Sequence, residues 1–465
     1  MTFEKSAGRK TTIRLAGWWV AMLYGGLTIF WLSLGSGYAE AQSEIATNAD
    51  TTSDDTSVTA PDAYETAAAT PPKDEPQDPA QTTPTQAQTP PKRYLDVYGF
   101  AMLDLGYDVK TNDPNWFDVI RPSKLPSFAG EFGRDGKTYA SVRQTRFGVK
   151  GFEPTAWGDL KVTFEFDMFG VGVDAGQTTI RPRHYYGELG PVLAGQTNSV
   201  FMDIDVFPNI VEYWGPNGMV FFRNPQLRWM PIRGDTHLWI ALERPGASAD
   251  AGVLADRIEI QNVQGRFQFP DVSAQYRQSW KRGYVQGAAI VRSIKLDHTA
   301  TGTVNLDQSI VGWGVDLSSN LKFRNDKDVL RLQYVFGDGV ENYMNDAPED
   351  VAAEPNFGNP LKPLKGKALP LRSFVTYLDH SWTDTWTTSV GYSQMIIDNT
   401  ILQTPSAFHK GQYATVNLLW SPFKNFMTGG EFQWARRANF SDGFRADDYR
   451  IQFSFKYSFN ARIGG

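Results

Sequence analysis

The chain has 465 residues, a formal net charge of -6 and no cysteine, which excludes disulfides and cysteine-thiolate chemistry. A mean hydropathy of -0.38 is that of a soluble protein. Such an average does not exclude a membrane barrel, because each lipid-facing apolar residue of a barrel strand is offset by a polar neighbour. The aromatic content of 14% favours the barrel.

The N-terminus has the pattern of a secretory signal. Four basic residues precede an apolar run at 15–34, and Ala39-Glu40-Ala41 follows it. This order of basic, apolar and small residues predicts a signal peptide over 1–41, cleaved after Ala41. The alternative is an uncleaved anchor, since about 20 apolar residues can span a bilayer.

Residues 42–92 differ sharply in composition from the rest of the chain. Thr, Ala, Pro, Asp and Gln dominate, and nine acidic residues stand against one lysine before Lys92. Few of these side chains could be buried, so ordering the backbone would cost entropy with little return. We expect a disordered, acidic periplasmic linker over 42–92, followed by a folded region at 93–465.

The folded region shows an alternation of apolar and polar residues. In the segment 449–459, six apolar or aromatic residues alternate with Arg450, Gln452, Ser454, Lys456 and Ser458. Successive side chains of a strand point to opposite faces, so the segment predicts a strand with one apolar face and one polar face. Sixteen candidate strands lie near 94–108, 138–152, 158–168, 180–189, 192–198, 219–230, 236–243, 271–279, 284–296, 309–321, 328–336, 371–379, 385–396, 411–420, 425–438 and 446–459.

The connections between these strands alternate between long and short. The segments 109–137, 199–218 and 337–370 are long, whereas 153–157 and 380–384 are short. Outer-membrane barrels have short periplasmic turns and long external loops, and a soluble sandwich has no reason for this asymmetry. We therefore predict an all-β fold, a transmembrane antiparallel β-barrel of about 16 strands, wide enough for an aqueous channel.

The third long loop, 199–218, is predicted to fold inward. In sixteen-stranded porins the loop at this position narrows the pore, so we assign it the constriction, with Asp203, Asp205 and Glu212 as its acidic residues. The alternative is an ordinary external loop or a loop that contacts another subunit.

Several motifs resemble one known family. They are Arg146-Phe147-Gly148-Val149-Lys150-Gly151, the stretch from Arg181 to Asp203, Gly215-Pro216-Asn217-Gly218, Arg223-Asn224-Pro225-Gln226-Leu227-Arg228 and Leu330-Arg331-Leu332-Gln333-Tyr334. Together they look like the DcaP-like outer-membrane porins over roughly residues 94 to 459. The resemblance implies a trimeric porin in the outer membrane of a Gram-negative bacterium that admits small organic anions, with dicarboxylates as the suggested class.

Two features depart from that family pattern. Family members carry a helical, coiled-coil-like segment before the barrel, whereas 42–92 has no heptads, so trimer contacts would have to come from the barrel wall. Barrels commonly end on an aromatic residue, whereas Phe459 is followed by 460–465.

Nine basic residues are predicted to line the pore. Arg146, Lys150, Lys161, Arg181 and Arg183 fall on the polar faces of three sequential strands and so on one arc of the wall; Arg450 and Lys456 extend it, and Arg228 and Arg331 complete the set. Rings of Arg or Lys favour anions in pores. Replacing Arg181 and Arg183 by serine should therefore weaken the preference for anions, and the barrel should still fold. The alternative is that Glu165, Asp167, Glu188 and Asp104 pair with the arginines and leave no selectivity.

Other kinds of site find little support. Two nearby carboxylates, Asp203 and Asp205, are too few for calcium, and the five histidines are scattered over different strands and loops. The basic residues are balanced by acids, which argues against nucleic acid.

We predict a non-enzymatic, passive diffusion channel without cofactor or metal, whose partners are outer-membrane lipid, small anionic solutes and two further copies of the chain. A phosphate-type anion porin, a barrel enzyme and a structural outer-membrane protein are the alternatives.

Overall fold

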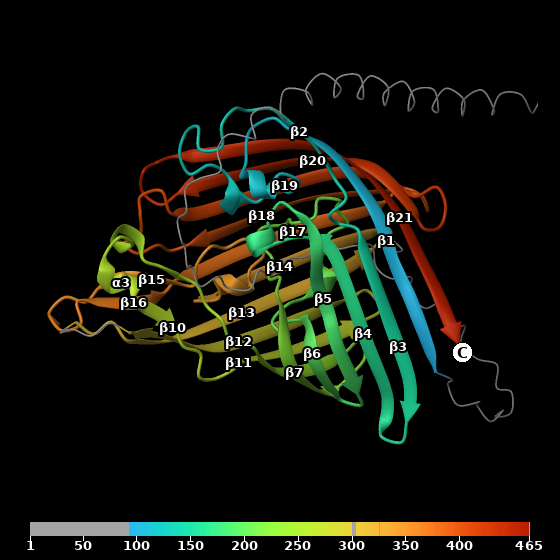
Figure 1. Cartoon of the computed structure of the whole chain (residues 1–465). Helices are drawn as coiled ribbons and strands as arrows, with labels where there is room; N and C mark the ends of the chain where they lie inside the picture. The colour runs from blue at the N-terminus through green and yellow to red at the C-terminus, as the bar shows by residue number, and fades with distance from the viewer. Residues whose placement is uncertain (1–92, 300–303, 325, 465) are drawn as a thin grey trace, which may run out of the picture. The chain divides into compact units, whose positions relative to one another are not determined.

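The structure is a computed structural model that describes residues 93–299, 304–324 and 326–464. The predicted signal peptide (1–41) and linker (42–92) lie outside the described residues. The described part is built almost entirely of β-strands that follow one another around a closed wall (Figure 1).

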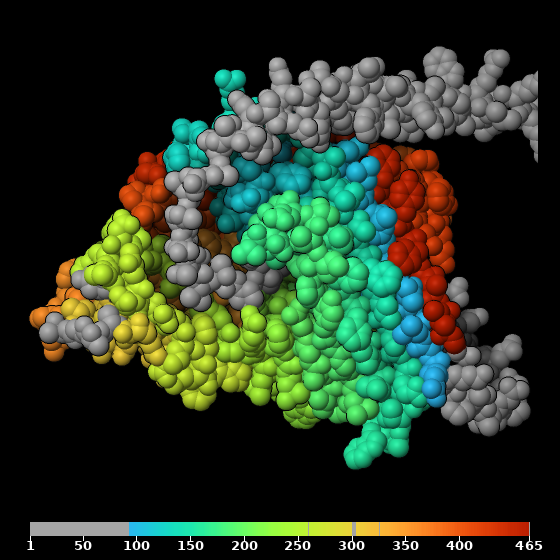
Figure 2. Space-filling view, in the orientation of Figure 1, coloured from blue at the N-terminus to red at the C-terminus, as the bar shows by residue number. Residues whose placement is uncertain are grey.

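Sixteen antiparallel strands form that wall. They are β1 (Tyr94–Asp108), β3 (Arg146–Thr155), β4 (Gly158–Phe169), β5 (Thr178–Leu189), β6 (Val192–Asn198), β7 (Arg223–Ile232), β8 (His237–Glu243), β11 (Asp271–Trp280), β12 (Gly283–His298), β13 (Gln308–Phe323), β14 (Asp328–Asp338), β17 (Pro370–Ser381), β18 (Trp386–Ile397), β19 (Phe408–Trp420), β20 (Phe426–Asn439) and β21 (Arg445–Gly464). β21 pairs with β1 from Tyr94↔Gly464 to Asp108↔Arg450 and closes the barrel. Figure 2 shows the blue N-terminal strand lying directly against the red C-terminal strand. The predicted sixteen-stranded antiparallel barrel is confirmed.

The smaller elements lie in the connections. They are β2 (Lys137–Ser141), β9 (Ala249–Asp250), β10 (Val263–Gly265), β15 (Val351–Pro355), β16 (Leu364–Ala368), the 3-10 turns η1 (Pro114–Trp116), η2 (Pro122–Lys124), η3 (Gly172–Asp174), η4 (Ile204–Val206), η5 (Gly252–Leu254) and η6 (Glu341–Tyr343), and the short helix α3 (Ile258–Gln261). β9, β15 and β16 form a separate three-stranded sheet. Within the described ranges, no helix is long and apolar enough to cross a membrane.

Three predicted strands differ from the observed ones. The segment predicted at 138–152 is two strands, β2 and β3, because the chain leaves the sheet at Arg143, whose guanidinium bonds to Asp118 and to the carbonyl of Gly170. The strand predicted from residue 219 begins at Arg223, since residues 219–222 pack into an apolar cluster instead. The strand predicted to end at Phe459 continues to Gly464, where Arg462 pairs with Asp96 of β1 at 2.7 Å.

The two faces of the wall are as the alternation predicts. On β21, Phe453 and Tyr457 are 54% and 57% exposed on the outside, whereas Arg450 and Gln452 are fully buried on the inside. Desolvated aromatic side chains suit lipid, and polar side chains suit a lumen that they fill with hydrogen bonds.

The connections divide between the two ends of the barrel. One end of the barrel carries short turns, such as 156–157, 190–191 and 281–282. β1 begins at this end and β21 finishes there. The opposite end carries the long segments 109–136, 199–222 and 339–369. The contrast is lost only at the last pair of connections, where 421–425 and 440–444 are equally short.

The largest buried apolar cluster joins two of these long segments to the wall. Phe201, Val206, Phe207, Met219 and Phe221 come from the segment 199–222, and all are buried. The same cluster includes Val340, Tyr343 and Met344 of the segment 339–369 and inward side chains of wall strands. Apolar burial of this kind fixes both segments against the wall.

Candidate functional site

The predicted arginines of β5 form buried ion pairs with acids of β4. Arg181 is bidentate to Asp167, with Nε–Oδ1 at 3.0 Å and Nη2–Oδ2 at 2.7 Å. Arg183 bridges two carboxylates, with Nε 2.6 Å from Glu165 and Nη1 2.9 Å from Asp167. The hydroxyl of Tyr213 donates to Asp167. These contacts are ion pairs between wall residues, the alternative that the sequence allowed for these arginines.

A register shift sets the orientation of Arg183. In the register of β4 and β5, Glu165 lies opposite His184 and Phe166 lies opposite Pro182. Arg183 has no residue opposite it and is the extra residue of a β-bulge. A bulge turns an additional side chain toward one face of a sheet. Arg183 and its neighbour His184 are therefore both close to Glu165.

The two lysines of the predicted arc, Lys150 and Lys161, are more accessible to solvent than its arginines. Lys161 is 57% exposed and lies 4.0 Å from Glu188, and exposed Lys150 lies 4.9 Å above the ring of Tyr98. Buried Arg146 is 3.7 Å from Glu165. Of the predicted arc, the two lysines are the cations most available to a solute.

The two cations of β21 lie next to the arc but are themselves engaged. Arg450 pairs with Asp108 at 2.5 Å and donates to the carbonyls of Phe117 and Val119 at 3.1 and 3.0 Å. The Lys456 ammonium lies 4.3 Å from the centre of the Phe100 ring. Arg450 thus anchors the segment 109–136 to the wall.

The acids of the segment 199–222 also have fixed partners. Asp203 accepts bonds from Arg277 and Tyr284 at 2.7 Å and from Ser318 at 2.6 Å. Half-exposed Asp205 pairs with Arg277 through its other guanidinium nitrogen. These contacts reach β11, β12 and β13.

Glu212 ties the same segment to two other parts of the barrel. Its carboxylate accepts bonds from Ile120 N at 3.0 Å, Trp214 N at 2.9 Å and the hydroxyl of Tyr413 on β19 at 3.1 Å. Burial raises the pKa of Glu212 to about 7, against the opposing effect of the Gly215 N–H. Glu212 therefore holds the loop in place and does not face solvent as a free acid.

Arg331 and Arg228 differ in their electrostatic partners. Arg331 pairs with Asp379 at 2.6 Å. Arg228 donates from Nε to Gln226 at 3.0 Å and from Nη2 to the carbonyl of Asn198 at 2.5 Å. No carboxylate of the described chain forms an ion pair with it, and Glu243 and Glu188 attract it only from farther away.

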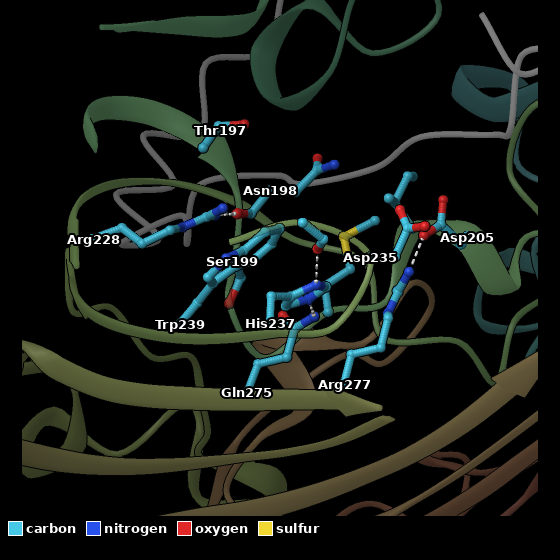
Figure 3. Close-up of a pocket in the computed structure, with 13 residues that line it drawn as sticks. Thr197, Asn198, Ser199, Asp205, Arg228, Asp235, His237, Trp239, Gln275 and Arg277 are labelled. Carbon is cyan, nitrogen blue, oxygen red and sulfur yellow. Dashed lines mark hydrogen bonds and ion pairs between the residues drawn. The ribbon is translucent and has the colours of Figure 1, made fainter. Parts of the chain in front are cut away.

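Arg228 lines a cavity of about 330 Å³ between β7, β8 and β11 (Figure 3). His237, Trp239 and Arg277 line it too, and none of the three is among the predicted site residues. Alternation along the predicted strands 236–243 and 271–279 places all three on polar faces, and this pattern could have identified them as residues that face the lumen. Among the residues that the structure describes, no cluster of three or more metal-binding side chains occurs.

The comparisons with known proteins agree with this geometry. The model of the DcaP outer membrane protein family matches residues 134–459. The chain belongs to this family. The chain is therefore an outer-membrane channel of the porin type, located in the outer membrane of a Gram-negative bacterium.

Three solved outer-membrane protein structures are similar to this chain. The outer membrane channel DcaP of Acinetobacter baumannii is 21% identical, with a TM-score of 0.64 over 79% of this chain and 98% of that one. An anion-selective porin from Comamonas acidovorans is 10% identical, with a TM-score of 0.49 over 79% of this chain and 100% of that one. OmpT of Vibrio cholerae in its trimer form is 8% identical, with a TM-score of 0.49 over 79% of this chain and 100% of that one. No curated protein matches the chain.

Proposed function

We propose that this channel is a passive diffusion pore that favours small anionic solutes bearing carboxylates. The supporting observation is an excess of positive charge on the sector from β3 to β7. Its inward-facing basic residues are Arg146, Lys150, Lys161, Arg181, Arg183 and Arg228, and its inward-facing acids are Asp159, Glu165, Asp167 and Glu188.

Ion pairing reduces this excess but does not cancel it. Arg223, buried at the start of β7, interacts electrostatically with Arg181 and Asp167 and adds a further positive charge. Charge of one sign along a low-dielectric wall focuses the field into the lumen and raises the local concentration of counter-ions. The exposed Lys150 and Lys161 are the groups that a passing solute would meet.

We also propose that the segment 199–222 lies across the lumen and forms its constriction. Its hydrogen bonds reach strands far apart on the wall: Asn209 N donates to Asp379 of β17 at 3.2 Å, and Val211 N donates to Glu431 of β20 at 3.0 Å. On the other side, Arg183 of β5 donates to the Tyr213 hydroxyl at 3.2 Å. A loop held at β5, β17 and β20 would narrow any path through the barrel.

Charge removal at the two exposed lysines tests the anion preference. In a planar bilayer with a salt gradient, we expect the Lys150→Gln/Lys161→Gln variant to show a reversal potential shifted toward zero relative to wild type. The control is Lys365→Gln/Arg372→Gln, which removes the same charge from exposed side chains outside this sector. An unchanged reversal potential in the lysine variant, or an equal shift in the control, would contradict the proposed role of the sector.

Three further elements of the account remain predictions: cleavage after Ala41, the linker at 42–92 and the homotrimer. Light scattering coupled to size exclusion in detergent would test the last, with a mass of three chains expected. A monomer mass would show that the outer face meets only lipid. We propose no covalent step for this protein, in keeping with its porin family and fold.

A further inference from the structure

We propose that the cavity between β7, β8 and β11 binds a small zwitterionic solute, with its carboxylate on Arg228 and its ammonium group toward Asp235. This inference rests on the proposed channel function and adds to its anionic solutes a second class, whose members carry one carboxylate and one ammonium group and have no net charge. The cavity, of about 330 Å³, lies beside the β7–β8 turn, which carries Asp235 at the short-turn end. That volume equals roughly eleven waters at about 30 Å³ each, enough for a short aminocarboxylate.

One end of the cavity offers a guanidinium that forms no ion pair with a described residue, although Glu243 and Glu188 attract it from farther away. Arg228 is 6% exposed and lies 4.7 Å from the centre of the Trp239 ring. Its protein contacts use Nε and Nη2, which leaves Nη1 without an acceptor in the described part of the chain. A buried charge without an adjacent counter-charge is costly. The planar guanidinium suits a carboxylate, which would supply that adjacent charge.

Two further polar atoms lack partners at this end. Trp239 Nε1 and Asn198 Oδ1 are buried and have no hydrogen-bond partner among the described residues. Buried polar groups are normally satisfied, so the pair points to a ligand with both donor and acceptor atoms.

The middle of the cavity is uncharged. His237 stacks on Trp239 with ring centres 4.0 Å apart. His237 Nδ1 lies 3.1 Å from the carbonyl of Gly234, and Nε2 lies 3.0 Å from the amide nitrogen of Gln275. This network assigns the proton to Nδ1 and makes the imidazole neutral, because Nε2 accepts from the amide. The flat ring pair can contact the methylene groups of a solute.

The opposite end is acidic. Arg277 is shared by Asp203, at 2.7 Å, and Asp205, while exposed Asp235 has no basic partner in the described part of the chain. The guanidinium of Arg277 is therefore shared by two carboxylates, and Asp205 and Asp235 are the acids that line this end of the cavity. Figure 3 shows Asp205 and Asp235 on the side of the cavity away from Arg228. Such an end attracts an ammonium group and repels a second carboxylate.

Four small probes of equal chain length separate the possibilities. Ion current through the purified, reconstituted channel is titrated with 4-aminobutyrate, butyrate, butylammonium and succinate, and the half-blocking concentration of each is measured. We expect 4-aminobutyrate to block at the lowest concentration. Arg228→Gln should raise its half-blocking concentration about tenfold or more, the loss expected for a charge-assisted hydrogen bond.

Substitutions at the two ends give different signatures. Asp235→Asn should raise the half-blocking concentration of 4-aminobutyrate about two- to fivefold, as for an exposed charge pair, and leave that of butyrate unchanged. Arg228→Lys keeps the charge but loses the planar fork, so an intermediate value is expected even where Arg228→Gln does not assemble. The control is Arg282→Gln, in another exposed turn at the same end of the barrel.

The outcomes distinguish this proposal from the channel function itself. Strongest block by succinate, or equal block by all four probes in a conducting channel, would overturn the zwitterion site. Block by 4-aminobutyrate that is insensitive to both Arg228 and Asp235 would do the same. Absence of any wild-type current would instead overturn the proposed diffusion pore.

Discussion

Replacing Arg181 and Arg183 together by serine is expected to destabilise the barrel by several kcal/mol. Breaking a buried ion pair costs about 3–5 kcal/mol, because the remaining charge loses its directly bonded counter-charge. Asp167 is fully buried and would keep its bonds from Tyr213 and from the Phe169 N–H and its weaker attraction to Arg223 and Arg146, but it would lose its two direct ion pairs. The measurement is the free energy of unfolding in lipid vesicles, from urea titration.

A charge-matched variant separates stability from selectivity. Adding Asp167→Asn and Glu165→Gln to the double serine variant removes the stranded carboxylates, and part of the lost free energy should return. The sequence led us to expect that the barrel would survive the arginine substitutions with only its selectivity altered. An unchanged unfolding free energy in the double variant would support that earlier expectation and contradict the role of these ion pairs.

Replacing Arg121 by alanine is expected to loosen three long segments at once and to raise the single-channel conductance. Arg121 pairs with Asp346 at 2.8 Å, and its guanidinium lies 4.2 Å from the ring centres of both Trp116 and Trp214. These partners come from 339–369, 109–136 and 199–222. The Trp214 ring nitrogen also donates to the carbonyl of Asn345 at 2.9 Å.

The size of this effect follows from burial. Arg121 and Asp346 are almost fully buried, so the broken pair should cost about 3–5 kcal/mol, against about 0–1 kcal/mol for an exposed pair. Lys110→Ala is the matched control, since the Lys110–Asp135 pair is exposed and lies in the same segment as Arg121. A double-mutant cycle with Asp346→Ala isolates the pair. Equal conductance in Arg121→Ala and wild type would show that the three segments do not restrict the path.

Most of the wall could be predicted from the sequence because one physical rule covers it. Lipid on one side and polar side chains on the other impose a period of two, so segments such as 94–108 and 192–198 are predicted to the residue. The rule weakens where the environment changes along a strand. The β2–β3 break at Arg143 and the late start of β7 both occur where the chain meets packed loops.

The site was less predictable because ion-pair partners depend on register and on loops. Alternation placed Arg181 and Arg183 on the inward face but could not show that the bulge at Arg183 joins both Glu165 and Asp167. Nor could it show that Tyr213, from a distant loop, would meet the same carboxylate. Arg277 had the right parity, yet its role depends on Asp203 and Asp205, whose positions are set by the fold of the segment 199–222.

The most direct test of the account is the reversal potential of the wild-type channel in a salt gradient across a planar bilayer. The excess of basic residues on β3 to β7, including exposed Lys150 and Lys161, predicts a potential of the sign that marks anion preference. A reversal potential of the opposite sign, marking cation preference, would contradict the proposed anion channel and show that the acids of the lumen decide its selectivity.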